Sequence, residues 1–125
     1  MRAAVCVCLL VLAGCGGDEP PEAPRPTQAP PPTGATRLEV TVRPRGGDGP
    51  PRRRVVTRVS AAVTAASLAP VPRDVACTEI YGGPATARVS GILRGESVDA
   101  TFNRVNGCEI ARWDRLASLL GRPPP

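Results

Sequence analysis

The sequence contains no histidine and no lysine, and its 125 residues include one phenylalanine, one tyrosine and one tryptophan. Without histidine, neither a Ser–His nor a Cys–His pair can form, which removes the commonest arrangements for nucleophilic catalysis. The carboxylates are scattered singly, and Gly82-Gly83-Pro84 is not followed by the Lys-Ser/Thr of a phosphate-binding loop. These absences predict a protein that is not an enzyme and that uses no cofactor.

The shortage of aromatic side chains also argues against a nucleic-acid partner. The net charge is +5, from sixteen arginines against eleven acidic residues. The dense basic cluster is Arg52-Arg53-Arg54, and there is no aromatic platform on which bases would stack. A binding module that does not act on nucleic acid is therefore the default expectation.

Long hydrophobic runs are absent as well. Residues 3–13 form an apolar stretch that is too short to span a bilayer but typical of the core of a signal peptide. The stretch ends in Leu12-Ala13-Gly14-Cys15, which resembles the bacterial lipobox. That resemblance implies a signal peptide over residues 1–14, a lipid on Cys15, and an anchored protein on the extracellular face of the cell membrane. An ordinary secretory signal with a chance cysteine is the alternative.

Export would change the count of cysteines. Cys6 and Cys8 leave with the signal peptide and Cys15 carries the lipid, so Cys77 and Cys108 remain. An even pair in an oxidising compartment predicts one disulfide bond. A metal site is a poor alternative, because two thiolates without histidine do not complete a zinc shell.

The mature chain divides by composition. Residues 15–36 are rich in proline and lack apolar periodicity, which predicts a lipidated cysteine followed by a semi-rigid tether. We expect the folded domain over residues 37–121 and a proline-rich tail over residues 122–125. A domain of this size is marginal for a single core, and the disulfide would add roughly 3 to 4 kcal/mol by the chain-entropy estimate.

Three segments of the domain alternate apolar and polar residues as a β-strand does, and a fourth segment follows this pattern less regularly. Residues 38–42 predict a strand, and residues 53–59 predict a second, less regular one. Residues 85–92 and 98–105 alternate on either side of the turn signal Arg94-Gly95, which predicts a β-hairpin.

Two further segments are expected to be helical. Residues 60–68 are rich in alanine and predict a short helix with Ser60 as its cap, ended by the prolines that follow. Residues 108–120 place Trp113 and other apolar side chains at helical spacing, which predicts an amphipathic helix with its tryptophan in the core. The expected fold class is therefore α+β, a small antiparallel sheet with one or two short helices and a disulfide.

The segments around the two paired cysteines resemble the Streptomyces subtilisin inhibitor-like family of actinobacteria. They read Cys77-Thr78-Glu79-Ile80-Tyr81-Gly82-Gly83-Pro84 and Asn106-Gly107-Cys108-Glu109-Ile110-Ala111-Arg112-Trp113-Asp114. The likeness covers about the last fifty residues, and the earlier strands match only in pattern. It implies a standard-mechanism inhibitor of a secreted, subtilisin-like serine protease, in which a rigid loop enters the protease cleft like a substrate.

The resemblance also implies residue roles. In that family the scissile bond lies two residues after the first cysteine of the second disulfide, which here is the bond Glu79–Ile80. Cys77, Thr78, Tyr81, Asn106 and Cys108 would then support the loop, with Asn106 as its brace. Relatives form dimers through their sheets, so the resemblance also allows a homodimer.

The sequence departs from the family pattern at two points. The earlier disulfide of most relatives is missing, and Val59 and Val63 stand in that neighbourhood. Glu79 is also an unusual specificity residue, since subtilisin-type pockets favour apolar groups and trypsin-type pockets need a cation. Glu79 as a solvated charge and Asn106 as a plain turn residue are the alternatives at these positions.

Two other functions compete with inhibition. The first is a non-inhibitory surface lipoprotein that uses the same scaffold to bind a protein or cell-wall partner. The second is a largely low-complexity lipoprotein with only a small folded tail.

Overall fold

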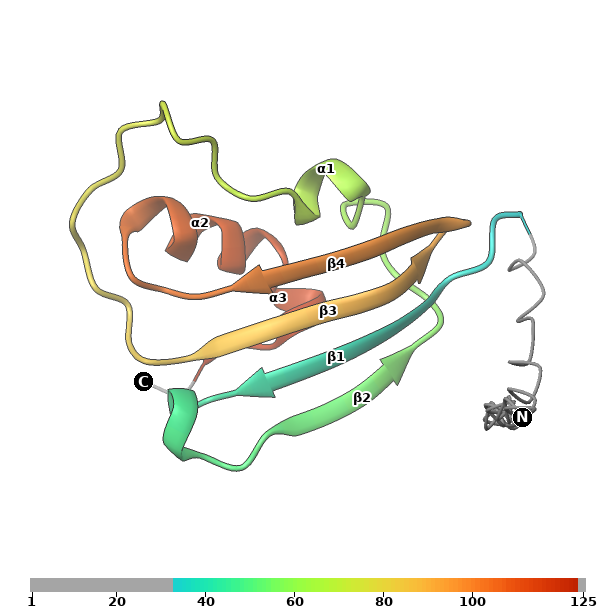
Figure 1. The fold of residues 1–125 in the computed structure, drawn as a ribbon, viewed down its shortest axis with the longest axis horizontal. Coiled ribbons are helices and arrows are strands. Elements are labelled where there is room, and N and C mark those ends of the chain that lie inside the picture. The colour runs from blue at the N-terminus through green and yellow to red at the C-terminus, as the bar shows by residue number, and fades with distance from the viewer. Residues whose placement is uncertain (1–32, 124–125) are drawn as a thin grey trace, which may run out of the picture.

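A computed structural model describes residues 33–123 as a four-stranded antiparallel sheet with three short helices, which confirms the expected α+β class (Figure 1). The proposed signal peptide, Cys15 and most of the tether lie outside the described residues. The strand order is β2-β1-β3-β4. The elements are β1 (Arg37–Arg43), a 3-10 turn (Gly46–Asp48), β2 (Arg52–Val56), α1 (Ala65–Leu68), β3 (Thr86–Leu93), β4 (Glu96–Phe102), α2 (Gly107–Arg115) and α3 (Ala117–Leu120).

One face of the sheet carries the core. Alternate residues of β1, β3 and β4 are buried and pack with the apolar side chains of the three helices into one cluster. On the opposite face, Arg88 and Asp99 form an exposed ion pair with a closest distance of 2.5 Å. The hydrogen bond from Arg88 lowers the pKa of Asp99 below its ordinary value. A folded domain that begins at β1 argues against the alternative of a largely low-complexity lipoprotein with only a small folded tail.

The outer strands end earlier than the sequence pattern predicts. β2 stops at Val56, which pairs with Leu38, because its partner β1 extends only one residue further. β4 stops at Phe102 instead of continuing to residue 105. Beyond it, the side chain of Asn103 accepts a hydrogen bond from the backbone N–H of Val105, which replaces ladder pairing by a local turn. Strand length is thus set by the neighbouring strand as well as by alternation.

The predicted helix over residues 60–68 is wrong in its first half. Only Ala65–Leu68 is helical, and its cap is Thr64, whose hydroxyl and backbone exchange hydrogen bonds with Ser67. The carbonyls of Ser60 and Val63 instead accept hydrogen bonds from the guanidinium of Arg94 in the β3–β4 turn. This long-range contact competes with helix formation and could not be read from local composition.

The predicted C-terminal helix is present but interrupted. At Leu116 the backbone leaves helical geometry, with φ of −107° and ψ of 18°, and the chain resumes as α3. Leu116, Leu119 and Leu120 are all buried and belong with Trp113 to the core cluster. Trp113 is fully buried, and its indole N–H donates to the Gly121 carbonyl at 2.9 Å, so its predicted place in the core is confirmed.

A buried arginine on α2 connects this helix to α1 and β4. Arg112, only 5% exposed, donates to the carbonyls of Leu68 and Thr101 at 2.6 and 2.9 Å and pairs with Glu109 at 3.2 Å. Its guanidinium carbon also lies 4.0 Å from the ring centroid of Phe102. These contacts fix α2 against β4 and α1.

Candidate functional site

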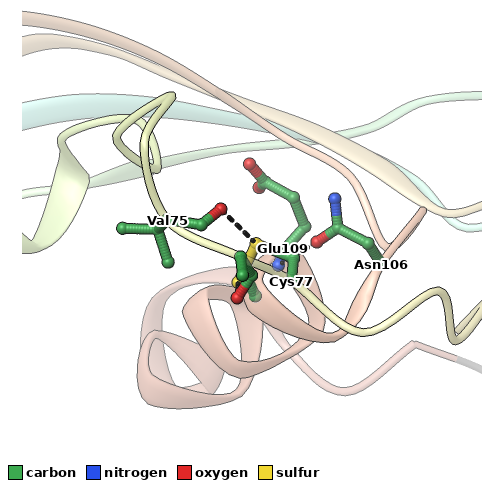
Figure 2. The surroundings of a disulfide bond; sticks show 6 residues. Val75, Cys77, Asn106 and Glu109 are labelled. Atoms are coloured by element: carbon green, nitrogen blue, oxygen red, sulfur yellow. Dashed lines mark hydrogen bonds between the residues drawn. A yellow bond between two sulfur atoms is a disulfide. The ribbon is translucent and has the colours of Figure 1, made fainter.

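The predicted disulfide between Cys77 and Cys108 is present (Figure 2). It joins the long connection between α1 and β3 to the first turn of α2, with the two Cα atoms 5.4 Å apart. The hairpin of β3 and β4 brings these distant cysteines together. The segment of residues 77–82 that begins at this bond is called the exposed loop below.

Backbone hydrogen bonds hold the exposed loop on both sides of its middle. On one side, the N–H of Gly107 donates to the Thr78 carbonyl at 2.9 Å. On the other side, the N–H of Gly82 donates to the Arg104 carbonyl at 2.7 Å, and the Arg104 guanidinium donates back to the Gly82 carbonyl at 2.9 Å. The loop has no regular secondary structure, yet its two ends are fixed to the rest of the fold.

Between these attachments lie Glu79, Ile80 and Tyr81, all of them exposed. Ile80 is 60% and Tyr81 66% exposed, which makes them two of the few large apolar side chains of the described residues that face solvent. An apolar residue held outward on a fixed backbone does not contribute to folding by burial. The arrangement can present three consecutive residues to a partner without first ordering them.

Two glycines allow the close approach that holds the loop. A Cβ atom on Gly107 would overlap the hydroxyl oxygen of Thr78, and one on Gly82 would lie 2.7 Å from the side chain of Ile110. Because both contacts are too close, a larger residue at either position must displace the side chain of Thr78 or of Ile110.

We expect Gly107→Ala to destabilise the domain by about 1 to 3 kcal/mol, because the added methyl group forces Thr78 out of place. Chemical denaturation measures this loss. Gly47→Ala is the matched control, since a Cβ there meets nothing within 4 Å, and it should change stability by less than about 0.5 kcal/mol. Equal effects of the two substitutions would show that the contact with Thr78 does not matter.

Asn106 and Tyr81 were also expected to support the loop, but neither forms part of its attachments as Cys77, Thr78 and Cys108 do. The side-chain oxygen of Asn106 accepts a hydrogen bond from the N–H of Glu109 at 2.9 Å and so caps α2. Its neighbour Gly107 provides the hydrogen bond to the loop. Tyr81 is exposed to solvent beside Ile80. The side chain of Asn106 thus caps α2, and its role as a brace of the loop stays a prediction.

Sequence reasoning missed Arg104. Its side chain is 13% exposed, bonds Gly82, pairs with Asp114 at 3.0 Å and lies with its guanidinium carbon 5.9 Å from the centroid of the Trp113 ring. The residue thus connects the far end of the loop to α2. No spacing or motif marks it, because its partners come together only when β4 and α2 pack.

An apolar groove of about 580 Å³ adjoins the loop on the side of Cys77. It lies between α1, the connection that follows it, and α2. The lining residues are Ala66, Ser67, Ala69, Pro70, Val71, Pro72, Val75, Cys108, Ala111, Arg112 and Arg115. The site is therefore a projecting loop beside a shallow groove.

In the described part of the chain, no set of three or more His, Cys, Asp or Glu side chains is placed to hold a metal ion. None of the helices over residues 33–123 has the length and apolar character to cross a bilayer. Comparison of the chain with protein-family models, curated proteins and solved structures found no match. The likeness to the subtilisin inhibitor-like family therefore rests on the residues quoted above.

Proposed function

We propose that this protein is a lipid-anchored inhibitor of secreted serine proteases of the subtilisin type or a related type. The observation that carries the proposal is the exposed tripeptide Glu79-Ile80-Tyr81 between two fixed attachments. Proteases bind substrates as extended strands through backbone pairing. A loop already ordered for this pairing loses little conformational entropy on binding, so it binds tightly.

The attachments also favour slow net hydrolysis at the bond Glu79–Ile80. After cleavage, the new carboxyl end would stay attached through the Cys77–Cys108 bond and the Thr78 carbonyl. The new amino end would stay attached through Gly82 to Arg104. Because neither end can leave, the amine remains close to the acyl-enzyme and the peptide bond can re-form.

The direct test is to incubate the protein with a panel of serine proteases at catalytic amounts and map the first bond cut. Inhibition with slow, single cleavage at Glu79–Ile80 is the expected result. The neighbouring bonds serve as internal controls, because they share the same solvent exposure on the loop. Rapid cleavage elsewhere, without inhibition of any protease, would refute the proposal.

The groove beside the loop favours a second candidate function, a surface lipoprotein that binds a protein or cell-wall partner without inhibiting a protease. Its lining combines apolar side chains with Arg112 and Arg115. This candidate would be preferred if the panel gave neither inhibition nor single cleavage.

The proposed anchor predicts that Cys15→Ala gives an unlipidated protein that no longer sediments with membranes. The reason is that lipidation requires the Cys15 thiol, while residues 3–13 are too short to span a bilayer stably. Fractionation of cells that export each form measures the difference. Equal sedimentation of the variant and the wild type would mean that another anchor exists.

A further inference from the structure

Strand β2 carries a dense positive charge on a free edge of the sheet. Residues 43–58 contain six arginines and one acidic residue, Asp48. Among residues 33–123, β2 pairs with β1 alone, and no other strand of this range lies on its outer side. Arg52, Arg53 and Arg54 are all exposed along this edge. We call these three residues the arginine edge.

The arginine edge projects from both faces of the sheet. Arg52 and Arg54 pair with Val42 and Val40 and so share their core-facing side, whereas Arg53 lies on the opposite face. On the core side, Arg54 donates to the Leu119 carbonyl. A groove of about 140 Å³ adjoins this contact, and its lining includes the arginine edge and Arg122.

The ion pairs found among residues 33–123 lie elsewhere. Arg88–Asp99 joins β3 and β4, while Arg104–Asp114 and Arg112–Glu109 involve α2. The three carboxylates of these pairs lie on β4 and α2, whereas Glu39 lies on β1 opposite Val55 of β2. The arginine edge and the neighbouring Arg122 concentrate positive charge at the β2 edge of the sheet, opposite the β4 edge.

Phosphate groups are the anions that suit this region. Guanidinium groups bind phosphate through paired hydrogen bonds, and several along one edge can engage several phosphates together. Nucleic acid suits it less well, because Trp113 and Phe102 are buried and Tyr81 lies on the exposed loop. We propose that the arginine edge binds the headgroups of an anionic phospholipid surface.

This contact would set the direction of the exposed loop. Cys108, to which the loop is tied, follows β4, and in the strand order β4 lies three strand spacings, about 14 Å, from β2 (Figure 1). A domain resting on its arginine edge therefore holds the Cys77 end of the loop farther from the membrane than its Gly82 end, which leads to Pro84 beside Gly46 of the β1–β2 connection. This orientation rests on the proposed lipid anchor at Cys15, but binding of the edge to lipid does not.

The test is co-sedimentation of the full chain carrying Cys15→Ala with vesicles of phosphatidylglycerol and phosphatidylcholine. Vesicles of phosphatidylcholine alone, which carry no net charge, are the control and measure binding that does not depend on an anionic surface. We expect at least tenfold stronger binding to the anionic vesicles and a steep loss as salt increases. In the same background, R52Q/R53Q should weaken anionic binding on the order of tenfold.

The matched control is R73Q/R115Q, which removes the same charge from exposed positions outside β2 and should change binding less than about twofold. R52K/R53K keeps the charge and should bind nearly as well as its parent, which guards against a folding defect in the glutamine variant.

Equal binding of both glutamine variants would overturn the proposal. So would oligomerisation of R52Q/R53Q with unchanged binding, because the arginines would then serve to block edge pairing. If a DNA duplex displaced the protein from the vesicles at a phosphate concentration below that of the lipid, the proposal would also be overturned, in favour of nucleic acid.

These outcomes are independent of protease inhibition. R52Q/R53Q leaves the exposed loop and both of its attachments intact, so its inhibition of a soluble protease should equal that of the parent. Loss of vesicle binding with inhibition intact separates the two proposals.

Discussion

Replacing Glu79 by leucine is expected to tighten binding to a subtilisin-type protease by roughly tenfold or more. Burying an unpaired carboxylate in an apolar pocket costs several kcal/mol, and each 1.4 kcal/mol is about a tenfold change in affinity. Leucine removes that cost and adds apolar contact. Inhibition constants of the two forms measure the gain.

The matched control is Glu96→Leu, which makes the same exchange at an exposed carboxylate where β4 begins. Affinity should be unchanged there, because the β3–β4 turn lies at the opposite end of β4 from the segment that leads to Cys108. If Glu79→Leu and Glu96→Leu have the same effect, Glu79 does not enter the protease pocket.

Glu79→Arg should redirect the loop to trypsin, whose primary pocket carries a buried carboxylate. A protease specific for glutamate would show the reverse preference and bind the wild type best. If these substitutions leave affinity unchanged for every protease tested, the exposed loop is not the reactive site.

Loss of the Cys77–Cys108 bond is expected to have the second large effect. The bond closes a chain separation of 31 residues, for which the chain-entropy estimate gives roughly 3 to 4 kcal/mol of stability. The double variant Cys77→Ser/Cys108→Ser should lose about this much in urea unfolding. Inhibition should fall on the order of a hundredfold or more, because the freed residues must be ordered again on binding.

Reduction of the wild type supplies the control for this comparison. A reductant should convert the wild-type protein into a substrate that is cut at several bonds, while the double-serine variant should be insensitive to it. Circular dichroism of the variant establishes the folded fraction under the assay conditions. Full inhibition by a folded variant would mean that the hydrogen bonds of Thr78 and Gly82 suffice to hold the loop.

The sequence predicted the features that depend on local pattern or on counting. Alternation identified β1 and the hairpin of β3 and β4, because the two-residue period of a strand with one buried face is visible in a single segment. The disulfide followed from the number of cysteines that export would leave. Trp113 was placed in the core by its helical spacing.

Apart from the disulfide, features that depend on contacts between distant segments could not be predicted. The end of β2 is set by the start of β1, and the irregular backbone before α1 is held by Arg94 from another turn. Within the site, the missed residue is Arg104. An arginine that bonds a glycine carbonyl and an aspartate on a helix has no signature before the chain has folded.

Arg112 has a consequence for how rigidity is distributed in this small domain. Its guanidinium joins Leu68, Thr101 and Glu109, and none of these belongs to the exposed loop. Yet α2, which it orients, carries Gly107 and Cys108, the residues to which the loop is tied. The buried Arg112 thus helps to fix the position of the exposed loop, although it bonds no residue of that loop. Selection for a rigid loop would therefore also act on Arg112, a residue that a partner bound at the loop tip does not contact.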